Sequence, residues 1–260
     1  MLIKLSSIRQ ILKLNFLKKL LILSGFFLIT IPLQTACGQK PDSQPLDNHL
    51  VDALNNQNIN NLSRLLSQED IIELDRKYES FKDIFPNAVW TIISGEPLQD
   101  GRSSLIIRVK AEETIDVHRY SLESEQRIGF RSEGGRVNDP EIISEYSIIE
   151  SSDSNLPIEI QIPDAVLTGE KYDVDLIYET PLNEEIIAGG LIAISQKEFE
   201  NQISPDMELE PLGAGGLFKS VTAPLSPSIQ RWSALLVHPK GIFSITKMVR
   251  VVSDESEINP

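Results

Sequence analysis

The sequence predicts an α+β chain in which short helices cover an antiparallel sheet and an all-β sandwich follows. Three observations predict this class. Apolar residues recur at spacings of three and four between residues 46 and 81. From residue 88 to residue 150 the apolar period changes to two. After residue 156 the apolar segments are short, and turn residues separate them.

The first 36 residues have the layout of a secretory signal peptide. Five basic residues and no acidic one precede or lie beside an apolar run at residues 20–33, LLILSGFFLITIPL. This run is shorter than the ~20 residues that a spanning helix needs. Because the positive charges come first, we expect the N-terminus to stay in the cytoplasm and the rest of the chain to be exported.

The single cysteine of the chain comes directly after this run. The segment LQTACG (residues 33–38) resembles a bacterial lipobox, in which a small residue precedes a cysteine that becomes lipid-modified. Thr35, Ala36 and Cys37 fit the pattern, whereas Gln34 stands where leucine is usual. The resemblance implies that Cys37 is the lipidated first residue of the mature chain, held at a cell-envelope or thylakoid membrane and facing the periplasm or lumen. A chance cysteine after an ordinary signal peptide or after an uncleaved anchor is the alternative.

The charge excludes one class of partner. The chain has 24 basic and 38 acidic residues, and removing the five basic residues of segment 1–36 lowers the net charge from −14 to −19. Such a chain is repelled by phosphate backbones and anionic lipid surfaces, so we expect no nucleic-acid partner and membrane contact only through the lipid. One cysteine and three separated histidines give no disulfide framework and no local metal cluster, and no cofactor is expected.

The chain after the signal begins with a tether. Residues 37–48 are rich in Gln, Pro, Asp and Ser, which is typical of a flexible spacer. Three short helices are then predicted, near residues 46–54, 62–66 and 67–81, with Asp47 as N-cap of the first. Pro86 ends the helical region.

Four strands are predicted next, at residues 88–94, 104–110, 118–130 and 137–150. The turns between them carry Gly and Asp, as at residues 95–102 and 133–136. Helices followed by such strands resemble the NTF2-like, cone-shaped fold over residues 46–150. This resemblance implies a pocket inside the cone, which in some members of that family is catalytic.

A polar hinge at residues 151–155 (SSDSN) marks the predicted domain boundary. Seven short strands follow within residues 156–252, which suggests an immunoglobulin-like β-sandwich with Trp232 as a core anchor. Residues 253–260 form a tail. No helical run is long enough for the crossovers of a doubly wound fold.

The mature chain as a whole resembles a group of bacterial envelope lipoproteins of cyanobacterial type. The segments that carry this resemblance are QIPDAVLTG (161–169), GAGGLFK (213–219) and LVHP (236–239). The resemblance implies a location and an architecture, and no activity.

Few residues suggest chemistry. Asp173 and Asp175 project from one face of a strand and could contribute to a Ca²⁺ site, but the solvent face of an alternating strand explains them better. Asp116 and His118 could transfer a proton in an NTF2-like pocket, but a surface pair at a strand end is favoured. His49 and His238 are expected at the surface.

Two motif-like segments have better structural explanations. GAGGLFKS (213–220) lacks the glycine that precedes lysine in a phosphate loop, and it indicates a bend or bulge that needs glycine. Ser244 and Lys247 match S-x-x-K, but on a strand they point to opposite faces. Trp90, Phe218 and Phe243 are expected in the core.

Three functions therefore remain. The first is a non-catalytic, lipid-anchored scaffold or assembly module with a protein partner. The second is a small-molecule-binding protein that uses the NTF2-like cone. The third is an enzyme that uses Asp116 and His118.

Overall fold

The computed structural model describes the part of the chain that forms strands, together with scattered positions before it. The described residues are 51, 55–56, 72, 75, 78–79, 81–83, 85–115, 118–133, 136–151, 156–180, 187–200, 206–213 and 215–260. The predicted signal peptide, Cys37, the tether and most of the three predicted helices lie outside them.

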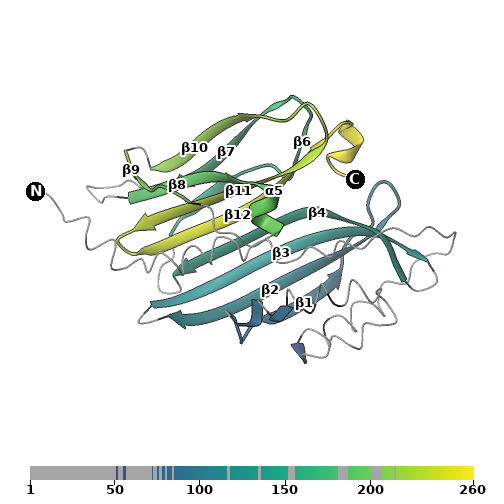
Figure 1. Ribbon diagram of the computed structural model, residues 1–260, viewed down its shortest axis with the longest axis horizontal. Helices are drawn as coiled ribbons and strands as arrows, with labels where there is room; N and C mark the ends of the chain where they lie inside the picture. Colours follow the sequence, from purple (N-terminus) through teal and green to yellow (C-terminus); the bar gives the residue numbers. More distant parts are fainter. Residues whose placement is uncertain are drawn as a thin grey trace, which may run out of the picture.

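The strands of the described chain fall into two groups (Figure 1). The N-terminal group consists of β1 (Val89–Ser94), β2 (Ser103–Ile115), β3 (His118–Glu133) and β4 (Arg136–Ser151). The C-terminal group consists of β5 (Ile158–Gln161), β6 (Ala165–Leu167), β7 (Lys171–Tyr178), β8 (Ile187–Ile194), β9 (Glu210–Leu212), β10 (Gly216–Thr222), β11 (Ser228–His238) and β12 (Gly241–Val252). Helix α5 (Gln196–Glu200) follows β8, and a 3-10 turn, η2 (Glu255–Glu257), lies near the C-terminus.

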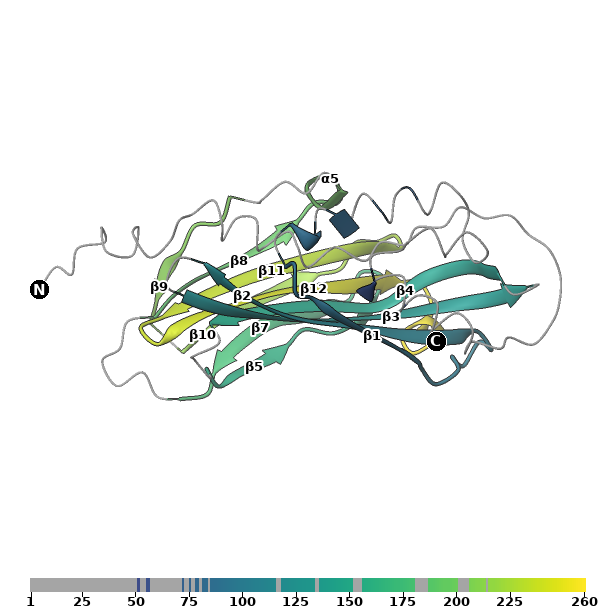
Figure 2. The same cartoon turned by 90° about the horizontal axis from the view of Figure 1, so that it is seen from below.

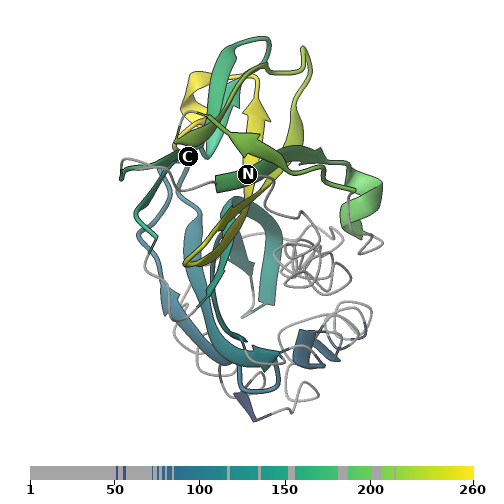
Figure 3. The same ribbon diagram turned by 90° about the vertical axis from the view of Figure 1, so that its left-hand side faces the viewer.

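The two groups are joined into one long sheet. Nine strands follow the order β1-β2-β3-β4-β12-β11-β8-β9, with β6 added beside β12. The junction is the antiparallel pair of β4 and β12, in which Ile148 lies opposite Ile245. A second sheet has three strands in the order β10-β7-β5. Figure 3 shows the N-terminal half of the long sheet below its C-terminal half.

The predicted α+β class, NTF2-like helices on a sheet followed by an immunoglobulin-like sandwich, is wrong. The described chain is an all-β sandwich, with 64% of its residues in strands and 9% in helices. Local apolar spacing correctly indicates where strands form, as at Val89–Ser94. It contains no information on the pairing of β4 with β12, about 100 residues apart in sequence, which makes one sheet of both halves.

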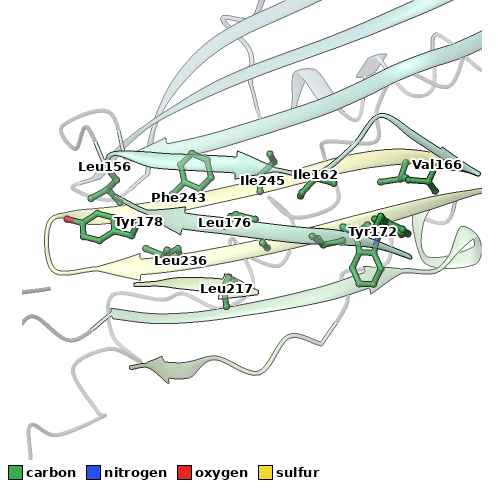
Figure 4. Close-up of a cluster of buried hydrophobic side chains, with 14 of the residues drawn as sticks. Leu156, Ile162, Val166, Tyr172, Leu176, Tyr178, Leu217, Leu236, Phe243 and Ile245 are labelled. Atoms are coloured by element: carbon green, nitrogen blue, oxygen red, sulfur yellow. Dashed lines mark hydrogen bonds between the residues drawn. The ribbon is translucent and has the colours of Figure 1, made fainter. Parts of the chain in front are cut away.

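One face of the long sheet packs against the three-stranded sheet, and we call it the sandwich face. It carries Phe243, Ile245, Val249 and Val251 of β12. Its partners across the gap include Tyr172, Val174 and Leu176 of β7, because alternate residues of that strand point inward. Figure 4 shows Phe243 and Ile245 of β12 together with Tyr172 and Leu176 of β7 in this core.

Trp232 is buried in this core, as predicted. Its indole N–H donates a hydrogen bond of 2.9 Å to the hydroxyl of Tyr172. That hydroxyl donates in turn to Oε1 of Gln230, at 2.6 Å. The polar atoms of two large aromatic residues are thus satisfied while their rings stay dry, which their burial requires.

The opposite face of the long sheet is also packed near β1. Trp90 points to this face, and its ring contacts Phe81 edge-on with centroids 5.5 Å apart and Tyr78 at 6.3 Å. Tyr78 and Phe81 are helical positions and are buried, as the apolar spacing predicts. Apolar side chains therefore cover this face at β1, and the sandwich face of the same strands is what remains open.

Candidate binding groove

The three-stranded sheet covers only the C-terminal half of the sandwich face. The register of the strands places Phe243 opposite Glu150, Ile148 opposite Glu123, and Glu123 opposite Lys110 on this face. Near the groove, this face of β2 and β3 carries exposed charged side chains, such as Lys110, Glu112 and Glu123, whereas most side chains of the other face are buried. A groove of about 870 Å³ lies where the covered half ends.

The groove has one apolar side. It is made of side chains from the start of the C-terminal group and from the sheet junction, namely Leu156, Ile158, Ile160, Ile148 and Phe243. Ile158 and Ile160 belong to β5 and pack against the core with one part of their surface. Their remaining surface, about half-buried, forms the groove wall. Apolar area next to an open polar floor is typical of recognition surfaces.

The floor of the groove is acidic. Four glutamates line it, against one lysine and one arginine: Glu112, Glu113, Glu123, Glu150, Lys110 and Arg119. Nζ of Lys110 lies 3.3 Å from Oε1 of Glu123, and both side chains are exposed, so this pair contributes little free energy. In the described part of the chain, Glu112 and Glu150 form no ion pair. The groove therefore carries a negative excess that a cationic ligand would balance.

The pKa of one of these acids, Glu150, is raised in the folded protein. Burial raises the pKa of its carboxyl above the ordinary value of 4.5, and the charge of Glu123 raises it further. Burial likewise raises the pKa of the neighbouring Tyr146, with smaller contributions from Glu125 and Glu123. The ionised form of Glu150 is thus disfavoured in the folded protein.

We expect Glu150→Gln to stabilise the protein at neutral pH. Because the folded state raises the pKa of Glu150, it holds the proton more tightly than the unfolded state. The contribution of this group to stability is complete below its ordinary pKa and is lost as the pH rises through the raised pKa. Thermal melts should place the variant above the natural protein near pH 7. The difference should shrink on acidification.

Glu198→Gln is a control for which we expect the opposite change in melting temperature. Hydrogen bonds from the hydroxyl and the main-chain N–H of Ser195 lower the pKa of Glu198, at the start of α5. Its contribution is present above the ordinary pKa of glutamate and is lost as the pH falls, so this variant should melt lower at neutral pH. If Glu150→Gln melts below the natural protein at neutral pH, as Glu198→Gln should, the assignment for Glu150 is wrong.

A second depression, of about 750 Å³, lies beside the C-terminal tail. Two arginines border it, Arg102 and Arg250, with Glu141 between them. Nη1 of Arg102 donates to Oε2 of Glu141 at 2.6 Å, and Nε of Arg102 donates to Asp100 at 2.6 Å. The guanidinium of Arg250 binds main-chain carbonyls of Ile143 and Ile258. These contacts tie the tail to the sheet and leave the arginines engaged.

The structure describes only some of the residues that the sequence singled out for chemistry. Asp173 and Asp175 lie on the outward side of β7, and Oδ1 of Asp175 accepts a hydrogen bond from the N–H of Lys219. His118 is exposed at the start of β3, with its ring 6.4 Å from that of Tyr120. Asp116, Cys37 and His49 lie outside the described residues. Among those described, no three His, Cys, Asp or Glu side chains gather as metal ligands would.

Two expectations about burial are wrong. His238 was expected at the surface but is only 4% exposed, because the turn after β11 folds its ring against Tyr178. The N–H of Lys240 donates to Nδ1 of His238, so the proton sits on Nε2, 3.3 Å from the Tyr178 hydroxyl. Phe218 was expected in the core but is 57% exposed, because its position on β10 points away from the long sheet.

The glycine-rich segment is a bend, as predicted. Gly215 has a φ of 39°, in the left-handed region that favours glycine. A β-carbon at Gly216 would lie 2.5 Å from the carbonyl oxygen of Leu176, so the close approach of β10 to β7 requires glycine there. Ser244 and Lys247 both lie in β12, a strand, which removes the S-x-x-K interpretation.

The sequence alone does not identify the residues that line the groove. Lys110, Glu123 and Glu150 look like ordinary solvent-facing positions of alternating strands. A signal was nonetheless present, because charged residues alternate at Arg108, Lys110 and Glu112. Only the position of β5 above them shows which of these charges share a groove.

Within the described residues, no helix is both long and apolar enough to cross a membrane. The comparisons with known proteins add one finding. Residues 153–252, which contain β5 to β12, match a family described as "Domain of unknown function (DUF8623)". No curated protein matches the chain.

Proposed function

We propose that this protein is a non-catalytic, lipid-anchored protein of a cell-envelope or photosynthetic membrane that binds a protein partner as a scaffold or assembly module. The N-terminal sequence supports the location: an apolar run follows basic residues, and Cys37 comes directly after it. Two or three acyl chains would anchor the protein firmly, because each buried CH₂ contributes about 0.8 kcal/mol.

The groove on the sandwich face is the observation that carries the binding role. It places an apolar wall with Ile148, Ile158 and Phe243 beside a charged floor, on a rigid sheet. A rigid platform loses little entropy on binding, and an apolar centre with a polar rim is the usual composition of a protein interface. The long open sheet around the groove offers further contact area.

The two alternatives have weaker support. The small-molecule hypothesis depended on an NTF2-like cone, and the all-β architecture removes that premise. The enzymatic hypothesis depends on Asp116 and His118, and His118 lies exposed at a strand start. An Asp116→Ala, His118→Ala double variant should leave the phenotype unchanged under conditions where deletion of the gene has one.

We expect Cys37→Ser to release the protein from the membrane fraction. Serine cannot form the thioether to the diacylglyceryl group, so the chain would lose its lipid. Fractionation with detergent phase separation, combined with the intact mass of the mature protein, tests this. Gln34→Leu is the matched control, because it restores the usual lipobox residue next to an unchanged cysteine and should keep the lipid. A Cys37→Ser protein of unchanged mass that stays in the membrane would contradict lipidation.

The partner is tested separately. Tagged protein from gently solubilised native membranes, after mild crosslinking, should bring down a partner in reproducible stoichiometry. Recovery of the protein alone, always at its own monomer mass, would count against the scaffold or assembly role.

A further inference from the structure

The outer edge of β5 borders the groove. In the described part of the chain β5 pairs with β7 alone, which makes it an edge strand of the three-stranded sheet (Figure 2). The N–H of Glu179 donates to the carbonyl of Pro157, so residues 157, 159 and 161 direct their main-chain groups toward β7. Ile158 and Ile160 therefore direct theirs away from β7, along the groove that their side chains line.

The edge retains its hydrogen-bonding capacity. Prolines flank β5 at positions 157 and 163, which usually protects an edge. The main-chain groups of Pro157, however, point toward β7, so the N–H that proline lacks removes no donor from the outer edge. Both outward-pointing residues are isoleucines and keep their N–H.

The first strand of the long sheet shows the contrasting arrangement. At β1 the side chain of Asn55 accepts from the N–H of Trp90 at 3.0 Å and donates to the carbonyl of Trp90 at 3.1 Å. This amide occupies both main-chain groups that an incoming strand would use at that position. β1 is thus blocked at Trp90, near its start, and no such side-chain cap is present among the described neighbours of Ile158 and Ile160.

We propose that the outer edge of β5 binds an extended segment of a partner protein, in which basic and apolar residues alternate, as an added strand lying in the groove. The proposal rests on the protein-binding role proposed above and specifies its surface. Main-chain hydrogen bonds to Ile158 and Ile160 would provide affinity, and alternate side chains would meet the floor.

The charges of the groove select the segment. The side chains that point toward the long sheet would be the basic ones, and they would reach Glu112, Glu123 and Glu150 on the acidic floor, while the apolar set would point to the opposite side of the added strand. The raised pKa of Glu150 is in keeping with a floor that gains from an added cation. A second copy of this chain is a poor occupant, because it would bring one negatively charged groove against another.

Peptide binding to the mature, full-length protein in detergent tests the proposal. The probe is a fluorescent eight-residue peptide with blocked ends in which lysine and valine alternate, measured by anisotropy. A peptide alternating glutamate and valine should bind at least about tenfold more weakly. A lysine–valine peptide with two alternate amides N-methylated keeps its charge but loses two hydrogen bonds, and should also weaken about tenfold. If the N-methylated peptide binds as tightly as the unmodified lysine–valine peptide, the proposed strand addition is wrong.

Protein variants test the floor. Glu112→Gln with Glu150→Gln should weaken the lysine–valine peptide about five- to tenfold and reduce the salt dependence of binding. Glu208→Gln with Glu210→Gln is the matched control, because it removes the same charge from exposed positions next to and within β9 and should leave binding unchanged. Equal weakening in both pairs would show that net charge, and not the groove, attracts the peptide, and would overturn the proposal.

The two proposals fail in distinguishable ways. If crosslinking recovers a partner that the Glu112→Gln, Glu150→Gln protein retains in full, the groove assignment is wrong while the binding role stands. If the natural protein recovers no partner at all, the binding role itself fails.

Discussion

Leu236→Ala is expected to lower the free energy of unfolding by about 2–5 kcal/mol. Leu236 lies in β11 with none of its side chain exposed, and it belongs to the core between the two sheets. Truncation to alanine removes apolar contacts and leaves a cavity that flanking β-strands, held by their ladders on both sides, cannot close. Urea denaturation followed by circular dichroism measures the change.

The same substitution at a second leucine is the control. Leu225 is 90% exposed in the loop before β11, so Leu225→Ala should change the free energy of unfolding by no more than about 0.5 kcal/mol. Equal losses in the two variants would mean that the contact between the three-stranded sheet and the long sheet is absent in solution.

Arg250→Met is expected to destabilise the protein by about 2–3 kcal/mol. Arg250 lies on β12 with its side chain 6% exposed. Its Nε donates to the carbonyl of Ile143 at 2.9 Å and its Nη2 donates to that of Ile258 at 3.2 Å. Burial lowers the pKa of this guanidinium, and the nearby Arg102 adds to that effect, while Glu141 opposes it. Methionine fills the space but leaves both carbonyls without a donor.

We also expect a local effect of Arg250→Met on the C-terminal tail. Because Arg250 holds the carbonyl of Ile258, hydrogen exchange within residues 253–260 should become faster than the loss of global stability explains. Arg131→Met removes the same charge from an exposed position of β3 and should leave both the stability and the tail unchanged. A tail that exchanges equally in all three proteins would show that Arg250 does not anchor it.

The candidate groove could not be predicted from the sequence, because its two sides come from different parts of the fold. The alternation of charges on β2 identifies a solvent-exposed face, and the alternation of Ile158 and Ile160 identifies a strand. That these surfaces meet depends on β5 pairing with β7 and lying over the end of β4. Likewise, burial and, to a smaller extent, the charge of Glu123 raise the pKa of Glu150, and both depend on the fold.

The wrong expectations for the exposure of His238 and Phe218 have a similar origin. The sequence places His238 in a turn, where exposure is the ordinary expectation, but it is the last residue of β11 and its ring packs on Tyr178, 60 residues away in sequence. Phe218 alternates with inward positions of β10, and its outward direction follows from the register in which it lies opposite Asp175. A strand pattern identifies two faces, and it does not say which face meets another sheet.

What the sequence by itself determined is local. The positions of most strands, the burial of Trp232 and the glycine bend before β10 follow from period-two alternation, residue size and the freedom of glycine, which neighbouring residues alone decide, whereas β6 (Ala165–Leu167) was not predicted. The tertiary structure decided the fold class and the groove. β4 is hydrogen-bonded to β12, and β5 packs over the open floor, although these segments are far apart in the sequence. No local pattern relates them, because the burial of apolar area depends on contacts between distant parts of the chain.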